Sequence, residues 1–202
     1  MDSGSHNAVS RTPSQTFDAF CREAVDFLSQ ASVPYLIIGG VAVATIGQPR
    51  ATGDVDVIGY VPTEKAIGLI DAAIAAGFTV ALDERETLQT TGTLRFRKGK
   101  FQLDIILASL PFENDALARA RQHRLFGRLV PLPSPEDLIL FKVLAGRDKD
   151  MVDAVGVARR HLAGLDRRYL HEAVQAVCEL AEDLTPLRRL DEVLRKASSA
   201  PV

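Results

Sequence analysis

Hydrophobic residues recur along the first two thirds of the chain with two different periods. A spacing of three and four residues, typical of amphipathic helices, occurs over 16–29 and 65–76. A short, continuously apolar run, typical of a buried strand, occurs at 33–38, and two further short strands are predicted at 55–58 and 78–82. Two further strand-like segments, 94–97 and 101–107, flank Lys98-Gly99-Lys100 and predict a hairpin. We therefore expect an α/β (α+β) fold, in which a mixed sheet of about four or five strands carries flanking helices.

From Ser134 onward the pattern is helical alone. Ser134 is a preferred N-cap residue, and Pro135 fits the first position of a helix. Further helices are expected over 148–161, 166–182 and 185–196. We therefore predict three parts: a disordered tail (1–15), an α/β core (16–133) and a C-terminal helical bundle (134–202).

The composition is ordinary for a soluble globular protein and excludes few functions. The chain has 24 Lys and Arg against 26 Asp and Glu, so no whole-molecule field favours nucleic acid or an acidic membrane. No apolar run is long enough to span a bilayer, and the polar N-terminus lacks the apolar core of a signal peptide. We expect a cytoplasmic protein with no membrane partner. Cys21 and Cys178 lie in helical patterns and indicate neither disulfides nor a metal motif.

Two carboxylates are spaced by one residue at the strand predicted over 55–58. Because strand side chains alternate between faces, Asp54 and Asp56 point the same way while Val55 and Val57 point into the core. Neighbouring carboxylates on a buried sheet repel each other and lose hydration, and a cation relieves both costs. Oxygen ligands without a nearby His or Cys favour Mg²⁺, with Mn²⁺ as the alternative, over zinc.

Two other features belong with this pair. Gly39 and Gly40 lie at a strand-to-helix junction, where backbone amides can hold a phosphate and a side chain would obstruct its approach. Asp104 is an acid in an otherwise apolar strand and needs a partner. That partner is either a metal ion shared with the strand pair or an arginine across the hairpin. The arginines within reach are Arg95 and Arg97.

Together these residues resemble the DNA polymerase β-like nucleotidyltransferase superfamily. Its signature is a Gly-Gly turn, an Asp-x-Asp on the next strand and a third carboxylate on a later strand. Within it, Arg50-Ala51-Thr52-Gly53-Asp54-Val55-Asp56 is similar to the Arg-x-Thr-x-Asp-hydrophobic-Asp form of the AbiEii-type group, which includes the toxins of some toxin–antitoxin pairs. The segment 135–153 is similar to the helical motif of that group, in which a Lys contacts the nucleotide and Lys-Asp-x-x-Asp follows.

The resemblance covers roughly 35–161 and implies transfer of a nucleoside monophosphate from a nucleoside triphosphate such as ATP to an acceptor hydroxyl. Metal ions then activate the attacking oxygen and stabilise the departing pyrophosphate. The catalytic, metal-binding residues would be Asp54, Asp56 and Asp104, the last nearest the attacking hydroxyl. The nucleotide-binding residues would be Gly39, Gly40, Arg50, Thr52, Lys142, Asp150 and Asp153.

For the helical residues the sequence leaves other roles open. Lys142 can equally be a solvated residue or a partner of an acid in its own helix, Glu136 or Asp137. Asp150 and Asp153 lie three apart, on one helix face, and could orient Lys142, orient the acceptor or simply be solvated.

The acceptor is open as well. One dense basic stretch could bind an RNA backbone, which would make tRNA an acceptor, or could simply be solvated. Its members are Arg119, Arg121, His123, Arg124 and Arg128. The resemblance also allows a cognate antitoxin as protein partner. Two other functions compete: a non-catalytic, antitoxin-like binding module, and an antibiotic-modifying enzyme with the same core. The presence of all three acids favours an enzyme.

Overall fold

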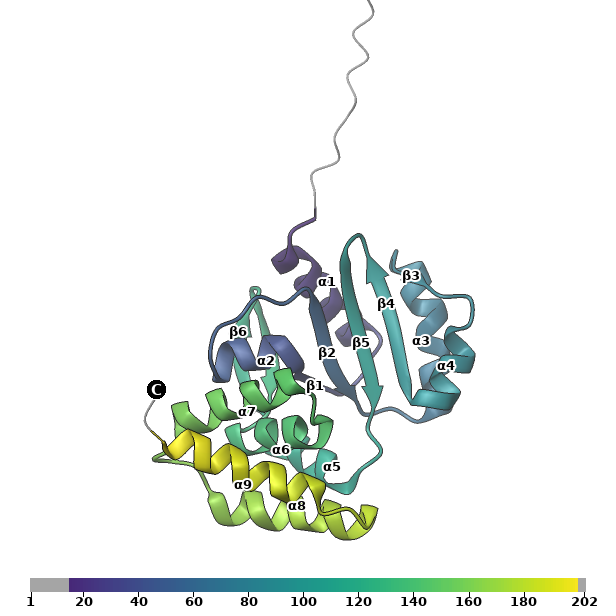
Figure 1. Cartoon of the computed structure of the whole chain (residues 1–202). Helices are drawn as coiled ribbons and strands as arrows, with labels where there is room; N and C mark the ends of the chain where they lie inside the picture. The colour runs from purple at the N-terminus through teal and green to yellow at the C-terminus, as the bar shows by residue number, and fades with distance from the viewer. Residues whose placement is uncertain (1–14, 200–202) are drawn as a thin grey trace, which may run out of the picture.

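The computed structural model describes residues 15–199, which form two sheets surrounded by helices (Figure 1). In chain order the elements are α1 (Phe17–Gln30), β1 (Tyr35–Ile38), α2 (Gly39–Ile46), β2 (Asp54–Gly59), α3 (Thr63–Ala75), β3 (Thr79–Val80), α4 (Glu84–Thr91), β4 (Thr93–Lys98), β5 (Phe101–Leu107), α5 (Pro111–Ala118), β6 (Arg121–Leu125), β7 (Arg128–Leu132), α6 (Pro135–Ala145), α7 (Asp148–His161), α8 (Arg167–Ala181) and α9 (Thr185–Ser198). The tail expected over 1–15 lies outside the described residues except for Gln15.

The main sheet has five strands in the order β1-β2-β5-β4-β3. β2 and β5 are parallel, and the other neighbouring pairs are antiparallel. The expected mixed sheet and α/β fold are therefore confirmed. The register places Asp56 opposite both Ile38 of β1 and Asp104 of β5, and Asp104 opposite Arg95 of β4. One row of side chains thus crosses four strands at the level of the predicted carboxylates.

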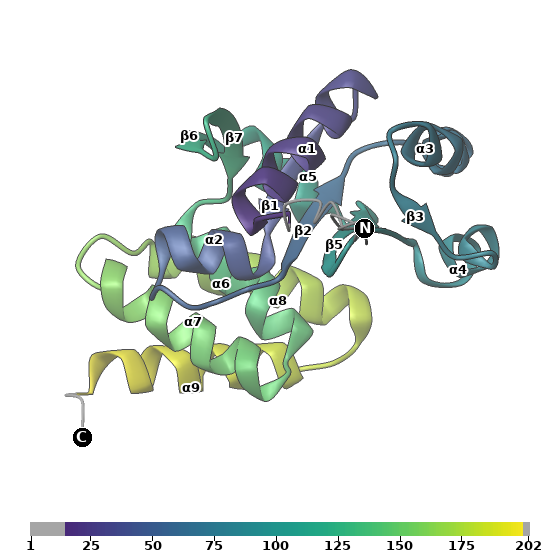
Figure 2. The ribbon, with the colours of Figure 1, turned by 90° about the horizontal axis from the view of Figure 1, so that it is seen from above.

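One face of this sheet carries the hydrophobic core. The residues of β2, β5 and β4 that alternate with the polar ones are fully buried there, among them Val57, Leu103 and Phe96. α1 and α3 cover this face, which Figure 2 shows from above, with α1 on the opposite side of the sheet from α7 and α9. Phenylalanine rings fill the space: Phe20 lies 5.5 Å from Phe101 between ring centroids. Burying such rings supplies roughly 2–3 kcal/mol each, so this face holds the strands in register.

The opposite face is only half covered. A smaller apolar cluster fills the end nearest β1, where Leu36, Ile38 and Ile58 pack with Ala116 of α5, and Phe141 of α6 lies against them. The other end of the same face carries the polar side chains of β2, β5 and β4. The fold therefore leaves those side chains facing a gap between the sheet and the C-terminal helices.

Helices α6 to α9 confirm the helical pattern expected after Ser134. The Ser134 side chain caps α6 by accepting a hydrogen bond from the Asp137 amide, and Gly146 ends the helix in the left-handed conformation. α7 then contacts α6, α2 and α9, which brings its first turns beside the open part of the sheet. Among the described helices, none is both long and apolar enough to cross a membrane.

Four elements, α4, α5, β6 and β7, were missed by the sequence patterns, and one strand is shorter than expected. α4 has only Leu88 and Glu84 buried, so it lacks an apolar stripe. α5 is eight residues long, and the β6–β7 hairpin is largely exposed and polar, with Val130 and Leu132 as its buried anchors. The strand expected over 78–82 is reduced to Thr79–Val80 at the sheet edge. In each case too few buried side chains repeat for a period to be visible.

Candidate active site

A cleft of about 400 Å³ lies between the open face of the sheet, the last turns of α6 and the first turn of α7. Most of the predicted site residues line it: Gly39, Gly40, Arg50, Thr52, Asp54, Asp56, Asp104, Lys142 and Asp150. Asp153 does not line the cleft itself but binds two residues that do. Segments more than ninety residues apart in the sequence therefore converge on one cleft, as the predictions require.

The Gly39-Gly40 turn fits closely around the acids of β2. Gly39 has a φ of +62°, and a Cβ atom there would overlap the carboxylate of Asp56. A Cβ on Gly40 would come within 2.6 Å of the Thr52 hydroxyl oxygen. That hydroxyl accepts a hydrogen bond from the amide of Asp54 at 3.3 Å and donates one to the Asp54 carbonyl at 3.2 Å. Both glycines are thus needed for β2 to approach α2, and Thr52 shapes the turn into β2.

Asp54 and Asp56 form an acidic pair that no basic side chain of the described residues neutralises. Asp54 is exposed, and no basic side chain of the described residues forms an ion pair with either carboxylate. Burial raises the pKa of Asp56, and the negative charges of Asp104 and Asp54 raise it further, while Lys142 and the Gly40 backbone act in the opposite direction. The protein thus stores unfavourable like-charge repulsion here, which a divalent cation would relieve.

Asp104 has a different environment. Arg95 donates to both of its oxygens, from Nε to Oδ1 at 3.0 Å and from Nη2 to Oδ2 at 3.1 Å. The Gln102 side chain donates to Oδ2 at 3.0 Å. Of the two partners that the sequence left open for Asp104, the structure therefore contains the arginine. Within residues 15–199, no three His, Cys, Asp or Glu side chains are grouped closely enough to hold one metal ion.

Even so, the donor set suits a hard cation. Asp54 and Asp56 supply carboxylate oxygens on one face, and their repulsion favours neutralisation by Mg²⁺ or Mn²⁺. Asp104 lies directly across from Asp56, but it can add its oxygens to this donor set only if its ion pair with Arg95 breaks.

The helix side of the cleft holds a buried ion-pair cluster. The Nζ of Lys142 lies 2.8 Å from Asp150 Oδ1 and 3.0 Å from Asp153 Oδ2. Arg50 donates to both oxygens of Asp153, and Arg147 donates to both oxygens of Asp150. The Lys142 side chain is only 6% exposed. Lys142 is therefore neither solvated nor paired with Glu136 or Asp137, and both of these alternatives were wrong. Of the roles considered for Asp150 and Asp153, orientation of Lys142 is the one that fits.

Charge in this cluster is well compensated, with a cationic excess. Burial disfavours the ionised form of Asp150, but hydrogen bonds from Arg147 and Lys142 outweigh burial and lower its pKa. Three basic side chains share two carboxylates, and Lys149, which also lines the cleft, has no ion-pair partner among the described residues. The helix side therefore presents positive charge to the acids of β2.

Sequence reasoning missed several residues that line the cleft: Gln102, Arg147 and Lys149. Arg95 was considered only as a partner for Asp104. Gln102 could have been found from the alternation of β5, which places it on the same face as Asp104. Arg147 and Lys149 flank the start of α7, where only the tertiary fold shows that they face the sheet.

The basic stretch between α5 and β7 is not a continuous patch of free charge. Arg119 binds the buried carboxylate of Asp137 and the hydroxyl of Tyr169, and Arg128 binds Asp26. Arg121 and Arg124 are exposed and have no ion pair among the described residues. Half of the arginines in this stretch therefore have structural roles.

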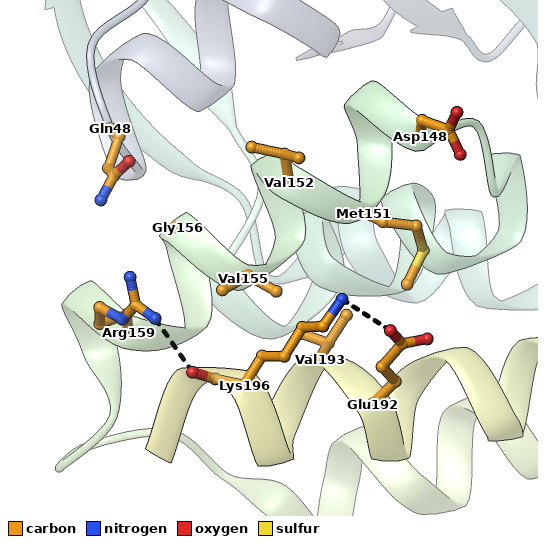
Figure 3. A pocket seen from close by; sticks show the side chains of 10 residues that line it. All are labelled: Gln48, Asp148, Met151, Val152, Val155, Gly156, Arg159, Glu192, Val193 and Lys196. Atoms are coloured by element: carbon orange, nitrogen blue, oxygen red, sulfur yellow. Dashed lines mark hydrogen bonds and ion pairs between the residues drawn. The ribbon is translucent and has the colours of Figure 1, made fainter. Parts of the chain in front are cut away.

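A second hollow, of about 460 Å³, lies between α7 and α9 (Figure 3). Its floor is apolar, formed by Met151, Val155 and Val193. It uses the face of α7 opposite to Asp150 and Asp153. The Lys196 ammonium group at its rim is already paired with Glu192 at 2.7 Å. It brings together no set of reactive groups, so we assign the chemistry to the cleft at the sheet.

The arrangement of the chain is similar to that of solved nucleotidyltransferase structures. The solution structure of the antibiotic-resistance factor ANT(2'')-Ia gives a TM-score of 0.55 at 16% identity, covering 82% of this chain and 94% of that chain. The crystal structure of ANT(2'')-Ia with adenylyl-2''-tobramycin gives 0.53 at 19% identity, covering 83% and 99%. An antigenic nucleotidyltransferase-like protein from Paracoccidioides brasiliensis gives 0.52 at 14% identity, covering 89% and 92%.

No protein-family model and no curated protein matches the sequence. At these identities the structural likeness shows the fold, which is that of the nucleotidyltransferases. The narrower resemblance to the AbiEii-type group stays a prediction.

Proposed function

We propose that this chain is a metal-dependent nucleotidyltransferase that moves a nucleoside monophosphate from a nucleoside triphosphate to an acceptor hydroxyl. The observation that carries the proposal is the opposition of charge across the cleft. The uncompensated acids of β2 face the cationic excess of the Lys142 cluster. A metal–triphosphate complex has the matching distribution, because its cation faces carboxylates while its phosphates face basic side chains.

The proposed roles follow from this geometry. Asp54 and Asp56 would hold Mg²⁺ or Mn²⁺, which when bound supplies charge neutralisation for the phosphoryl transfer. Lys142, fixed by Asp150 and Asp153, would bind the triphosphate as a point charge, and the Gly39-Gly40 turn, which lines the same cleft, would bind it from the sheet side. These groups position the α-phosphate and keep the pyrophosphate side of the cleft positive.

Two further roles complete the set. Asp104 would accept the proton of the acceptor hydroxyl, because it lies opposite Asp56 and on the β4 side of the cleft. Arg50 uses Nε and Nη2 for its pair with Asp153. Its Nη1, which makes only a long contact of 3.4 Å with the Ala51 carbonyl, would bind phosphate.

RNA, for example tRNA, is the acceptor that we propose first. Arg121 and Arg124 remain exposed on the β6–β7 hairpin and could contact its backbone. A role as the toxin of a toxin–antitoxin pair rests on the resemblance of the motif from Arg50 to Asp56 to that group. Expression in a bacterial host tests that role: the chain should arrest growth, and Asp54→Ala should relieve the arrest. Co-expression of a small protein encoded beside the gene tests the antitoxin partner, because a cognate antitoxin should also relieve the arrest.

A second acceptor class is an antibiotic. It is favoured by the fold likeness to ANT(2'')-Ia, whose crystal structure contains adenylyl-2''-tobramycin. A cationic aminoglycoside needs acidic partners, however, and the β4 side of this cleft carries Arg95. We therefore place this acceptor second.

The direct test is incubation with each of the four nucleoside triphosphates labelled at the α-phosphate, with Mg²⁺ or Mn²⁺. Total RNA, cell lysate and tobramycin serve as separate acceptors, and the Asp54→Ala/Asp56→Ala variant is the control. We expect label to enter RNA with release of pyrophosphate. Label on tobramycin or on protein would reject RNA but keep the chemistry. Absence of transfer under every condition would favour the non-catalytic binding module.

A further inference from the structure

Arg95 forms the wall between the candidate active-site cleft and a neighbouring hollow. The hollow, of about 450 Å³, lies over β3, β4 and α4, and Arg95 lines both spaces. Four threonines line the hollow, Thr79, Thr87, Thr91 and Thr93, together with two acids, Asp83 and Glu84. Arg97, two residues along the same strand face, lines it as well. A molecule in this hollow would therefore reach the acids of the cleft by way of Arg95.

In the described conformation Arg95 holds Asp104 away from any role in the cleft. Its guanidinium occupies both carboxylate oxygens at 3.0 and 3.1 Å. A guanidinium in that position also repels a divalent cation that approaches the same carboxylate. Asp104 can therefore not serve the metal site while this bidentate pair is closed.

Arg95 is built so that its head can move while its backbone stays fixed. Its side chain is 48% exposed, whereas that of Asp104 is 12% exposed. The edge strand β3 is too short to pair with Arg95. The backbone amide of Arg95 donates a hydrogen bond to the buried carboxylate of Glu84 instead. Because the guanidinium is half exposed, it can leave the carboxylate for a competing anion without being drawn out of the protein interior.

We propose that Arg95 binds a phosphate group of the acceptor in the hollow, and that this exchange of partners releases Asp104 to the metal site. The inference rests on the proposed function. A phosphate offers the guanidinium the same bidentate geometry as a carboxylate. The hydroxyl groups of Thr79 and Thr87 can donate to its other oxygens, whereas those of Thr91 and Thr93 already donate to backbone carbonyls. Arg97 has Gln102 as its hydrogen-bond partner, at 3.3 Å, and no ion pair among the described residues, so it can add a second positive contact. The acceptor is then a phosphate-bearing molecule.

Binding of Mn²⁺, followed by the paramagnetic signal of the free ion, tests this without an acceptor assay. Arg95→Gln should bind Mn²⁺ about fivefold more tightly than the wild type, which is about 1 kcal/mol. Arg95→Lys keeps a charge but loses the fork and should fall between them. Two variants, Arg97→Gln and Arg85→Gln, serve as matched controls and should bind Mn²⁺ with wild-type affinity. Arg97 lines the hollow without touching Asp104, and Arg85 pairs with Asp71 on the surface of α4.

Sulfate, as a stand-in for phosphate, should tighten Mn²⁺ binding of the wild type at constant ionic strength and leave Arg95→Gln unchanged. Arg97→Gln should need about fivefold more sulfate for the same effect. Ribose 5-phosphate and a short RNA oligonucleotide, used in place of sulfate, distinguish the two sources of phosphate by the concentration that each requires.

Equal Mn²⁺ affinity of the wild type and Arg95→Gln would overturn the proposal, as would a wild-type protein that does not respond to any of these anions. Both results leave the proposed function standing. Absence of Mn²⁺ binding by every variant would instead remove the proposed metal site, and the inference with it.

Discussion

The two walls of the cleft solve the problem of buried charge in opposite ways. On the strand side, burial and the neighbouring carboxylates raise the pKa of Asp56, and no cation of the described residues pairs with it. On the helix side, Asp150 is more deeply buried, yet hydrogen bonds from Arg147 and Lys142 lower its pKa. Buried acids are ordinarily neutralised by partners, as on the helix side.

This difference shows which side of the cleft has its charges neutralised without a ligand. We call the acids on β2 and β5 the strand wall, and the Lys142 cluster on α6 and α7 the helix wall. The helix wall is stabilised by its own ion pairs and is ready before any ligand binds. The strand wall carries unrelieved repulsion, which is a common property of sites that receive a cation. Substitutions in the strand wall should therefore impair chemistry and metal binding without lowering stability, whereas substitutions in the helix wall should lower stability and weaken triphosphate binding.

The largest effect is expected for Asp104→Asn. An amide cannot accept the proton of the acceptor hydroxyl, so transfer of the labelled nucleotide should fall by about 10²–10⁴-fold. Binding of the nucleoside triphosphate, measured by titration calorimetry, should change little. A far-ultraviolet circular dichroism spectrum equal to that of the wild type controls for disturbance of β5. Equal losses in binding and in transfer would show that Asp104 belongs to the binding wall.

The next effect is expected for Lys142→Met, which keeps the volume of the side chain and removes its charge. Asp150 and Asp153 would each lose one buried ion pair, so the free energy of unfolding should fall by about 2–3 kcal/mol. Urea denaturation measures this, and triphosphate binding should weaken in the same variant. Lys149→Met, next to the same cleft but without an ion pair among the described residues, should retain wild-type stability. A stable Lys142→Met protein would contradict the helix-wall account.

A gain in stability, rather than a loss, is expected for Asp54→Asn/Asp56→Asn without ligands. Removing the repelling pair should raise the free energy of unfolding by about 0.5–1 kcal/mol near pH 7. The same urea titration measures it. Asp71→Asn, on the exposed surface of α3, controls for the loss of a negative charge as such. Destabilisation of the double variant would mean that the pair is already satisfied.

The smallest effect concerns pH. The pKa of Asp56 is raised in the folded state, so its contribution to stability is full below the unfolded value of about 3.9 and is lost as pH rises through the folded value. The stability gained by Asp56→Asn should therefore shrink as pH falls from 7.5 towards 4.5. Asp150 behaves oppositely, since its contribution is lost only as pH falls through a value below the ordinary one. A pH-independent advantage of Asp56→Asn would exclude the raised pKa.

How much the sequence could predict depended on whether a residue's role is local. The turn at Gly39-Gly40, the alternation of Asp54 and Asp56, and the cap at Ser134 are decided by a few neighbours, and the structure has the expected elements at all three. Partners across the fold are not visible in this way. Nothing near Asp153 in the sequence indicates Arg50, which lies 103 residues away, and α4 gave no signal because its buried residues are so few.

The most direct test of the central claim is titration of a non-hydrolysable triphosphate analogue, with and without Mg²⁺, into the wild type and Asp54→Asn/Asp56→Asn. If the strand wall holds the cation and the helix wall the phosphates, Mg²⁺ should tighten binding to the wild type. The double variant should bind the analogue with an affinity that Mg²⁺ does not change. Binding to both proteins with the same Mg²⁺ dependence would contradict the assignment of the metal to β2, and with it the division of labour between the two walls.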